Sequence, residues 1–208
     1  MLSMELLCVL WCCWCGMHSL LIDTRVVDFL NRLLPGFVRY YRILYNGLSL
    51  ATLIPLAIVT RSSGGEVIVA WTTYTLPVRV LLLGTALALF YSASKRYDLQ
   101  YFLGVKQFHT GKNNLLMGPG EEFSEAGVFG LTRHPWYLGS LLLIWSALRE
   151  YPLAVFLAAC ILSFYLLVGT ILEEKKIIAR YGEPYRKYQQ RVSMIFPWKW
   201  LKRRLLGE

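Results

Sequence analysis

Long apolar runs, separated by polar and basic segments, constrain this chain more than any other feature. Five runs stand out, and they are Met4–Ile22, Ile43–Val59, Leu76–Ser92, Pro135–Leu148 and Tyr151–Leu172. A helix needs about 20 residues to cross the hydrocarbon of a bilayer, so the fourth run is short for a full crossing. Because backbone polar groups must be satisfied inside a bilayer, the runs predict an all-α integral membrane protein with about five transmembrane helices.

The composition supports one membrane domain rather than a soluble one. Of the 208 residues, 56% are hydrophobic, and the mean hydropathy is +0.44. These values are too apolar for an ordinary soluble domain. We expect a single domain over 1–208, with a three-helix part at 1–92, a cytosolic loop with an interfacial helix at 93–134, and a C-terminal hairpin and tail at 135–197.

Basic residues predict the orientation. Most of the 22 lysines and arginines lie in Asp23–Arg42, in Ala93–His134 and after Glu173. Because cytoplasmic loops are enriched in these residues, we expect the N-terminus outside and the helical C-terminal tail in the cytosol. The net charge of +9 then reflects topology and attraction to anionic membrane lipids, and it does not indicate nucleic-acid binding.

The first apolar run is a poor secretory signal, because no lysine or arginine precedes it, and we interpret it as a retained helix. Four cysteines lie in it, and they are Cys8, Cys12, Cys13 and Cys15. Small apolar cysteines pack well between helices, so packing is favoured over a metal or redox site. No metal site is predicted. His18 is expected to be a polar packing residue.

Local signals predict the loop and the tail. Asp98–Phe108 could form a short amphipathic helix at the interface, and His109–Ala126 is typical of a flexible loop or lid. After Leu172 the helix should continue through Tyr181 and stop at Gly182. Glu183-Pro184 should then open a helix with Tyr185, Tyr188 and Val192 on one face. Phe196, Trp198 and Trp200 beside basic residues are typical of an interfacial anchor.

Ionisable residues flank the last two apolar runs. Arg133 and His134 precede Pro135, which suits the first turn of a helix, and Glu173-Glu174 follows Leu172. A helical hairpin returns its two ends to one side of the bilayer, so these four side chains should converge. Charged groups placed against hydrocarbon are costly and are usually functional. We therefore expect a site here.

The spacing of these residues resembles a known signature. It comprises Arg133-His134-Pro135-x-Tyr137-x-Gly139, Glu173-Glu174 and Tyr181-Gly182-x-x-Tyr185-x-x-Tyr188-x-x-x-Val192-x-x-x-x-Pro197. This pattern is similar to the C-terminal signature of the isoprenylcysteine carboxyl methyltransferase family, and phospholipid N-methyltransferases share a similar one. His18–Leu21, Arg39–Asn46 and Tyr97–Gly104 resemble the NnrU-like branch, which includes bacterial membrane thiol methyltransferases.

The resemblance implies an S-adenosyl-L-methionine-dependent membrane methyltransferase whose C-terminal hairpin and tail hold the cofactor. That donor is a sulfonium carrying an ammonium, a carboxylate and an adenosine. Glu173 or Glu174 can serve the ammonium or the ribose, and His134 with helix N–H groups can meet the carboxylate. Aromatic walls could come from Tyr137, Tyr185 and Tyr188.

The catalytic candidates are Arg133 and His134. Arg133 could orient a carboxylate acceptor, whereas a thiol acceptor would need His134 as a base. The acceptor stays open between a small thiol, a prenylcysteine carboxylate and a lipid amine, and the N-terminal resemblance favours a small or lipophilic molecule. Two other interpretations remain, namely an NADPH-dependent enzyme similar to membrane sterol reductases and a non-enzymatic NnrU-like accessory protein.

Overall fold

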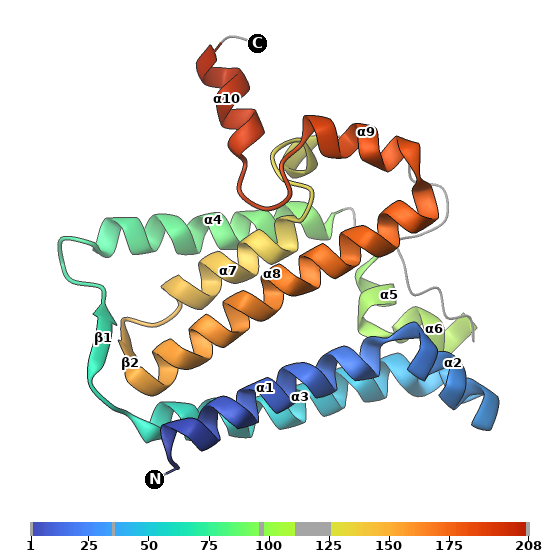
Figure 1. The fold of residues 1–208 in the computed structure, drawn as a ribbon, viewed down its shortest axis with the longest axis horizontal. Helices are drawn as coiled ribbons and strands as arrows, with labels where there is room; N and C mark the ends of the chain where they lie inside the picture. The colour runs from blue at the N-terminus through green and yellow to red at the C-terminus, as the bar shows by residue number, and fades with distance from the viewer. Residues whose placement is uncertain (1, 35, 96–97, 111–125, 207–208) are drawn as a thin grey trace. The chain divides into compact units, whose positions relative to one another are not determined.

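The computed structural model describes residues 2–34, 36–95, 98–110 and 126–206, and these are mainly helical (Figure 1). The helices are α1 (Met4–Ile22), α2 (Thr24–Leu33), α3 (Val38–Ser63), α4 (Leu76–Ser94), α5 (Leu99–Leu103), α6 (Val105–Thr110), α7 (Pro135–Ser146), α8 (Leu153–Tyr181), α9 (Glu183–Arg191) and α10 (Trp198–Leu206). A 3-10 helix, η1 (Gly127–Gly130), and two short paired strands, β1 (Val67–Ala70) and β2 (Glu150–Pro152), complete the fold. The all-α membrane class is confirmed.

Four helices in the described residues are long and apolar enough to cross a bilayer, and they lie at Met4–Ile22, Arg39–Ser63, Leu76–Ser94 and Leu153–Tyr181. The expectation of about five spans is therefore wrong by one. The missing one is α7, whose 12 residues rise about 18 Å where the hydrocarbon is about 30 Å thick. Arg79 binds the end of α7, donating from Nε to the Ser146 carbonyl at 2.8 Å and from Nη2 to the Ala147 carbonyl at 3.0 Å.

The chain forms two compact units. The first contains Met1–Val69, Tyr97–Pro119 and Tyr151–Leu162, and the second contains Ala70–Arg96, Gly120–Glu150 and Ser163–Glu208. The predicted parts 1–92, 93–134 and 135–197 follow the order of the sequence, whereas both units gather segments from distant positions. The division predicted from the sequence stays a prediction.

In the first unit, polar side chains join apolar helices. Trp11 of α1 donates its indole N–H to Thr60 Oγ1 of α3 at 2.9 Å, and Trp14 donates to Thr52 Oγ1 at 3.1 Å. His18 Nε2 lies 2.7 Å from the Tyr45 hydroxyl. Hydrogen bonds of this kind hold helices together in lipid. They support the interpretation of His18 as a packing residue.

Two features of the first unit differ from expectation. Asp23–Arg42 was predicted only as a basic segment, but it contains α2, which Asp23 caps by accepting from the Arg25 N–H at 2.9 Å. The interfacial helix is split into α5 and α6 at Gly104, whose φ is +91° and where a Cβ would lie 2.9 Å from the Ile43 nitrogen. Only glycine fits this position without strain. Most of the predicted lid at His109–Ala126 lies outside the described residues.

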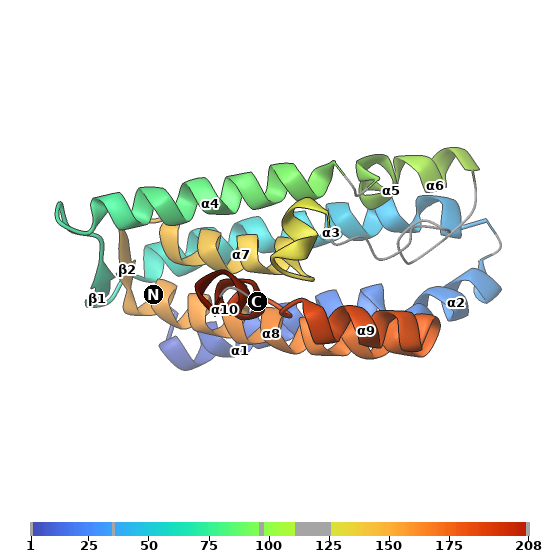
Figure 2. The same cartoon turned by 90° about the horizontal axis from the view of Figure 1, so that it is seen from above.

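The second unit is organised around α4 and α7, which lie side by side in both views (Figures 1 and 2). Their close approach occurs at Gly139, where a Cβ would lie 3.0 Å from Cε1 of Phe90. Later in the chain, α8 ends at Tyr181 and α9 begins at Glu183. Between them Gly182 turns the chain with a φ of +61°. These boundaries were predicted and are confirmed.

Candidate functional site

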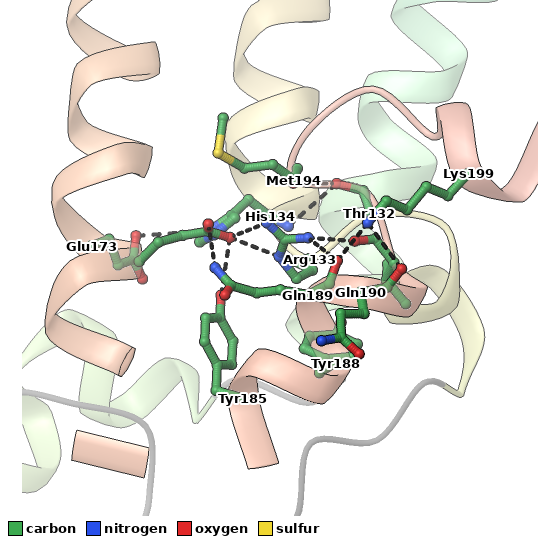
Figure 3. Close-up of polar contacts among 12 residues, drawn as sticks. Thr132, Arg133, His134, Glu173, Tyr185, Tyr188, Gln189, Gln190, Met194 and Lys199 are labelled. Atoms are coloured by element: carbon green, nitrogen blue, oxygen red, sulfur yellow. Dashed lines mark hydrogen bonds and ion pairs between the residues drawn. The ribbon is translucent and has the colours of Figure 1, made fainter. Parts of the chain in front are cut away.

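The candidate site lies within the second unit, where the segment before α7 meets the end of α8, α9 and the segment after α9. Figure 3 shows the side chains that converge there. Arg133 and His134 come from the segment before α7, Glu173 and Glu174 from α8, and Tyr185 from α9. The meeting of the basic and acidic pairs was predicted from the hairpin, and it is confirmed.

Backbone pairing fixes the segment that carries Arg133 and His134. Thr132 and Ser193 form an isolated parallel β-bridge. The N–H of Arg133 donates to the Ser193 carbonyl at 2.9 Å, and the N–H of His134 donates to the Met194 carbonyl at 3.2 Å. The Thr132 hydroxyl also donates to the Met194 carbonyl at 2.9 Å. The backbone N–H of His134 is thus used within the protein, and the binding of a ligand carboxylate by His134 and the N–H groups at the start of the helix stays a prediction.

A buried ion pair forms the centre of the site. Arg133 Nε lies 2.7 Å from Glu174 Oε1, and Nη2 lies 2.5 Å from the same oxygen. The two side chains are only 7% and 11% exposed. Arg133 Nη1 donates to the carbonyls of Gln189 and Val192. Because a buried charge is tolerated only when it is paired and hydrogen-bonded, this arrangement satisfies both groups.

The Glu174 carboxylate is surrounded by further donors. His134 Nε2 lies 3.2 Å from Oε1, the Tyr185 hydroxyl donates to the same atom at 3.1 Å, and Gln189 Nε2 donates to Oε2 at 2.8 Å. A carboxylate has about four lone-pair sites; Arg133, His134 and Tyr185 share Oε1, while Gln189 alone donates to Oε2. Glu174 is therefore placed to hold the site together, and its side chain is only 11% exposed.

His134 lies between two carboxylates. Its Nδ1 is 3.9 Å from Glu173 Oε2, and its Nε2 faces Glu174. An ionised carboxylate can only accept, so the contact with Glu174 requires a proton on Nε2, and in the neutral ring Nδ1 is then the basic nitrogen. Glu173 differs from Glu174 because its side chain is 39% exposed. It is the accessible acid of the pair.

The tyrosines of α9 are buried in this structure. Tyr185 and Tyr188 form a cluster with Ile177 and Val192, as the periodicity predicted. The Tyr188 hydroxyl donates to the Phe129 carbonyl at 2.7 Å, and Tyr185 donates to Glu174. Burial, followed by the negative charge of Glu174, raises the pKa of Tyr185 above its ordinary value. The geometry places both rings as supports of the site, and their predicted part as adenine walls stays a prediction.

Tyr137 lies beside the imidazole of His134. Its ring centroid is 5.6 Å from that of His134, with the planes at 86°. Across from it, α8 has Gly169, where a Cβ would lie 3.6 Å from Tyr137 Cε1. The tyrosine ring therefore fits over a helix position without a side chain, and Tyr137 remains a candidate for contact with a cofactor.

Residues that the sequence analysis missed complete the site. Lys199 donates from Nζ to the carbonyls of Gln189 at 2.6 Å and Gln190 at 2.9 Å. Its backbone N–H donates to Ser193 Oγ at 2.8 Å. The Lys199 ammonium stabilises the end of α9, since the last carbonyls of a helix lack intrahelical partners and carry partial negative charge. The only local signal in the sequence was a run of basic residues, which does not indicate which groups Lys199 binds.

Within the described residues, no group of three or more His, Cys, Asp or Glu side chains is arranged to hold a metal.

Comparison with known proteins gives several similar sequences, all named methanethiol S-methyltransferase. The protein from Bradyrhizobium diazoefficiens is 39% identical over 72 residues, which is 35% of this chain and 25% of that protein. The Pseudomonas deceptionensis protein is 39% identical over 70 residues, covering 34% and 26%. The Mycobacterium tuberculosis protein is 32% identical over 84 residues, covering 38% and 34%. The matched part thus spans about a quarter to a third of these relatives.

These relatives belong to the isoprenylcysteine carboxyl methyltransferase-like branch of membrane methyltransferases, so the resemblance seen in the sequence is confirmed. No solved structure matches the chain. A family model matches residues 47–192, which is well over half of the chain. The matched range includes the Arg133–Gly139 motif, Glu173 and Glu174, and α9. The chain therefore belongs to the family described as "Protein of unknown function (DUF1295)".

Proposed function

We propose that this protein is a membrane methyltransferase that transfers a methyl group from S-adenosyl-L-methionine to a small thiol. One observation carries the proposal. His134 lies between a buried carboxylate and an accessible one, in a chain similar to proteins named methanethiol S-methyltransferase. Such a histidine can act as a base, because one nitrogen is fixed by Glu174 and the other is left basic.

The donor set fits a cationic methyl donor. When bound, S-adenosyl-L-methionine supplies an electrophilic methyl group on a sulfonium centre. Glu173 is partly exposed and lies beside His134, so its carboxylate can meet the positive charges of that molecule. The Glu174 side chain is only 11% exposed, and its carboxylate accepts from Arg133, Tyr185 and Gln189. We therefore assign the cofactor contact to Glu173, with Tyr137 as a further candidate, and give Glu174 the task of positioning His134.

A thiol acceptor suits His134. Nδ1 can take the thiol proton and leave a thiolate, which is the nucleophile that the displacement needs. The resulting imidazolium would lie between the carboxylates of Glu173 and Glu174. The displacement is in line, so alignment of sulfur, methyl carbon and leaving group by fixed side chains should supply much of the acceleration.

The state of Arg133 favours a thiol over a carboxylate acceptor. A carboxylate would need a cation to orient it, and Arg133 was the candidate. In the structure its guanidinium is buried and its donors face Glu174 and the carbonyls of Gln189 and Val192. We therefore propose Arg133 as a positioning residue that holds Glu174, and through it His134.

The proposed orientation keeps the site on the cytosolic side, with the N-terminus outside and the C-terminus in the cytosol. Basic residues after Glu173 support it, since such residues are retained on the cytoplasmic side. Lys175, Lys176, Arg186 and Lys187 are all exposed near the site. The cytosol would also supply the donor.

The test uses the purified full chain and a donor labelled in its methyl group. Methanethiol, a prenylated cysteine and phosphatidylethanolamine are offered as acceptors, and transferred label is measured. We expect label on the thiol. His134→Gln should lower kcat by about 100-fold or more, whereas His109→Gln, a matched change at an exposed histidine of the first unit, should leave kcat unchanged.

Three outcomes would contradict the proposal. Label on the prenylated cysteine or the lipid alone would change the acceptor class. Tight binding of NADPH without binding of the methyl donor would favour the reductase-like interpretation. Absence of transfer to every acceptor, with normal folding, would favour a non-enzymatic accessory role.

A further inference from the structure

The helix α2 lies between the ends of two helices that can cross a bilayer. The first candidate span ends at Ile22 and the next begins at Arg39, and both belong to the first unit. Asp23 alone separates α1 from α2. Its N–H donates to the Leu20 carbonyl at 3.2 Å, which ends α1, and its side chain caps α2. With no loop between the two helices, α2 begins at the level where the span of α1 ends.

The direction of α2 differs from that of α1. Figure 1 shows α2 running across the line of α1, at the end of α1 that is farther from the N-terminus, and Figure 2 also shows α2 at that end. A helix that lies across a membrane span, at the level where the span ends, runs along the surface of the bilayer. The depth and the direction of α2 are thus those of an interfacial helix.

The residues of α2 separate into one apolar and one polar side. At 3.6 residues per turn, the apolar residues fall within one arc of about 160°. They are Val26, Val27, Phe29, Leu30 and Leu33. Polar residues occupy the opposite side, and they are Arg25, Asp28, Asn31 and Arg32. A helix with this division has one side suited to an apolar medium and one suited to water.

The protein covers only one edge of the apolar arc. Val27 is 1% exposed and forms a cluster with Tyr41 and Tyr45 of α3. At the other edge, Phe29 is 60% exposed and Leu33 is 59% exposed. Packing within the unit therefore explains Val27, and it does not explain why the apolar arc continues to Phe29 and Leu33.

The two flanks of α2 have opposite chemistry. Because Val27 faces α3, Leu33 lies on one flank and Asp28 on the other, each roughly 100–120° around the helix from Val27. In a helix that runs along the bilayer surface, one flank faces the hydrocarbon and the other faces water. Burial of the Asp28 flank in hydrocarbon would be costly, whereas burial of the Leu33 flank is favourable. The bilayer around α1 reaches this level, so covering the flank needs no further partner.

The charges of α2 complement a lipid headgroup layer. Arg25 and Arg32 are exposed, and in the described part of the chain neither forms an ion pair. They lie four residues before and three residues after Phe29, so they are its neighbours on the helix surface. Long basic side chains in this position can extend to lipid phosphates. Asp23 and Asp28 balance the two arginines, so α2 has no excess charge that would require an anionic lipid.

We propose that α2 lies in the headgroup layer of the bilayer that α1 crosses. Phe29 and Leu33 face the acyl chains, Arg25 and Arg32 meet lipid phosphates, and Asp28 faces water. The docking is driven by burial of apolar side chains. It goes beyond the proposed function and does not depend on it.

The test measures how fast thiols on the two sides of α2 react. The full chain is placed in lipid discs of phosphatidylcholine that hold one copy each and leave both faces of the bilayer accessible. Phe29→Cys, Leu33→Cys, Asp28→Cys and Asn31→Cys are made singly and treated with a charged maleimide that does not enter lipid. All four positions are exposed in the protein itself, so without lipid cover the four thiols should react alike. We expect the thiols introduced at Phe29 and Leu33 to react about ten-fold or more slowly than the other two, since covering apolar residues of this size is worth at least that factor.

Controls separate the apolar side from the polar one. Mass spectrometry of the peptides distinguishes the introduced thiol from the native cysteines, and Cys15, which is buried in α1, should stay unlabelled in every folded variant. In the Leu33→Cys protein, Phe29→Gln should speed labelling, because it removes the larger apolar contact. Asp28→Asn, a change on the polar side, should leave the rate unchanged. Replacing half of the lipid with phosphatidylglycerol should also leave it unchanged.

Three results would overturn the proposal. Equal labelling of all four thiols in single-copy discs would show that no lipid covers this side. Slow labelling only in discs that hold two copies would assign the apolar side to a second copy of the chain. Slow labelling only with phosphatidylglycerol would show that charge, and not apolar burial, holds α2 at the membrane.

Discussion

Glu174 binds Arg133 through two nitrogens of one guanidinium, at 2.7 and 2.5 Å, although the residues are 41 positions apart in the chain. Both side chains are almost fully buried, and the same carboxylate accepts from Tyr185 and Gln189. The pair therefore joins the segment before α7, the end of α8 and α9. A catalytic site built on these elements depends on this contact for its geometry.

Loss of the Glu174 charge should destabilise the protein strongly. Glu174→Gln leaves the Arg133 guanidinium buried without its counterion, and removing one partner of a buried pair costs about 3 kcal/mol or more. Unfolding in a detergent micelle, followed by circular dichroism against denaturant, should report this loss. Glu183→Gln, at an exposed acid that begins α9, is the matched control and should change stability far less. A Glu174→Gln variant as stable as the wild type would show that the pair is not a structural anchor.

Loss of the Glu173 charge, unlike loss of the Glu174 charge, should weaken binding of the methyl donor and leave stability nearly unchanged. Its carboxylate is partly exposed and its nearest basic partner, His134 Nδ1, is 3.9 Å away, so Glu173→Gln should leave stability within about 0.5 kcal/mol. The substitution removes the accessible negative charge that we assign to the cationic donor. Titration calorimetry with S-adenosyl-L-methionine should show about ten-fold or greater weakening, the size of a lost charged hydrogen bond. Unchanged affinity would place the donor elsewhere.

Local chemistry predicted many boundaries of the fold. Pro135 begins α7, Tyr181 ends α8 before Gly182, and Glu183 begins α9. Each boundary depends on residues within one helical turn, which is the range over which caps, proline and glycine act. The shared face of Tyr185, Tyr188 and Val192 followed from helical periodicity for the same reason.

Features that depend on distant partners were not predictable in this way. The apolar run at Pro135–Leu148 continues past Ser146, and nothing in it shows that Arg79 binds the end of a 12-residue helix. The bridge between Thr132 and Ser193 and the bonds of Lys199 likewise join segments that only the fold brings together. The hairpin placed Glu173 and Glu174 near His134, but their unequal exposure depends on α9.

Tyr185 should make stability depend on alkaline pH. Burial and the Glu174 charge raise its pKa, so above about pH 10 an unfolded tyrosine loses its proton while the folded one keeps it. The folded state then binds more protons, and the free energy of unfolding must fall as pH rises above that value. Tyr185→Phe should flatten this decline, although it removes a hydrogen bond to a charged group that is worth about 2 kcal/mol at neutral pH. Thermal unfolding at several alkaline pH values measures the slope.

The control for Tyr185→Phe is Tyr74→Phe. The Tyr74 side chain is 94% exposed in the folded protein, so its surroundings change little on unfolding. Its slope should match that of the wild type. If Tyr185→Phe and the wild type decline equally between about pH 10 and 11, the hydroxyl of Tyr185 does not keep its proton in the folded state. The hydrogen bond to Glu174 would then be broken in solution.

Gly139 should be required for the packing of α7 on α4. A Cβ there would lie 3.0 to 3.3 Å from three ring atoms of Phe90, so Gly139→Ala forces the ring or the helices apart and should cost about 1–3 kcal/mol. Gly84→Ala is the matched control, because that glycine is also inside a helix of the second unit but a Cβ there meets nothing within 4 Å. Gly84→Ala should gain up to about 1 kcal/mol from helix propensity, so the two alanine substitutions should change stability in opposite directions.

Phe90→Leu should partly rescue Gly139→Ala, since it removes the ring atoms that the new methyl group meets. If Gly139→Ala stabilised the protein as much as Gly84→Ala, α4 and α7 would be further apart than the structure places them, and the segment carrying Arg133 and His134 would be less firmly held.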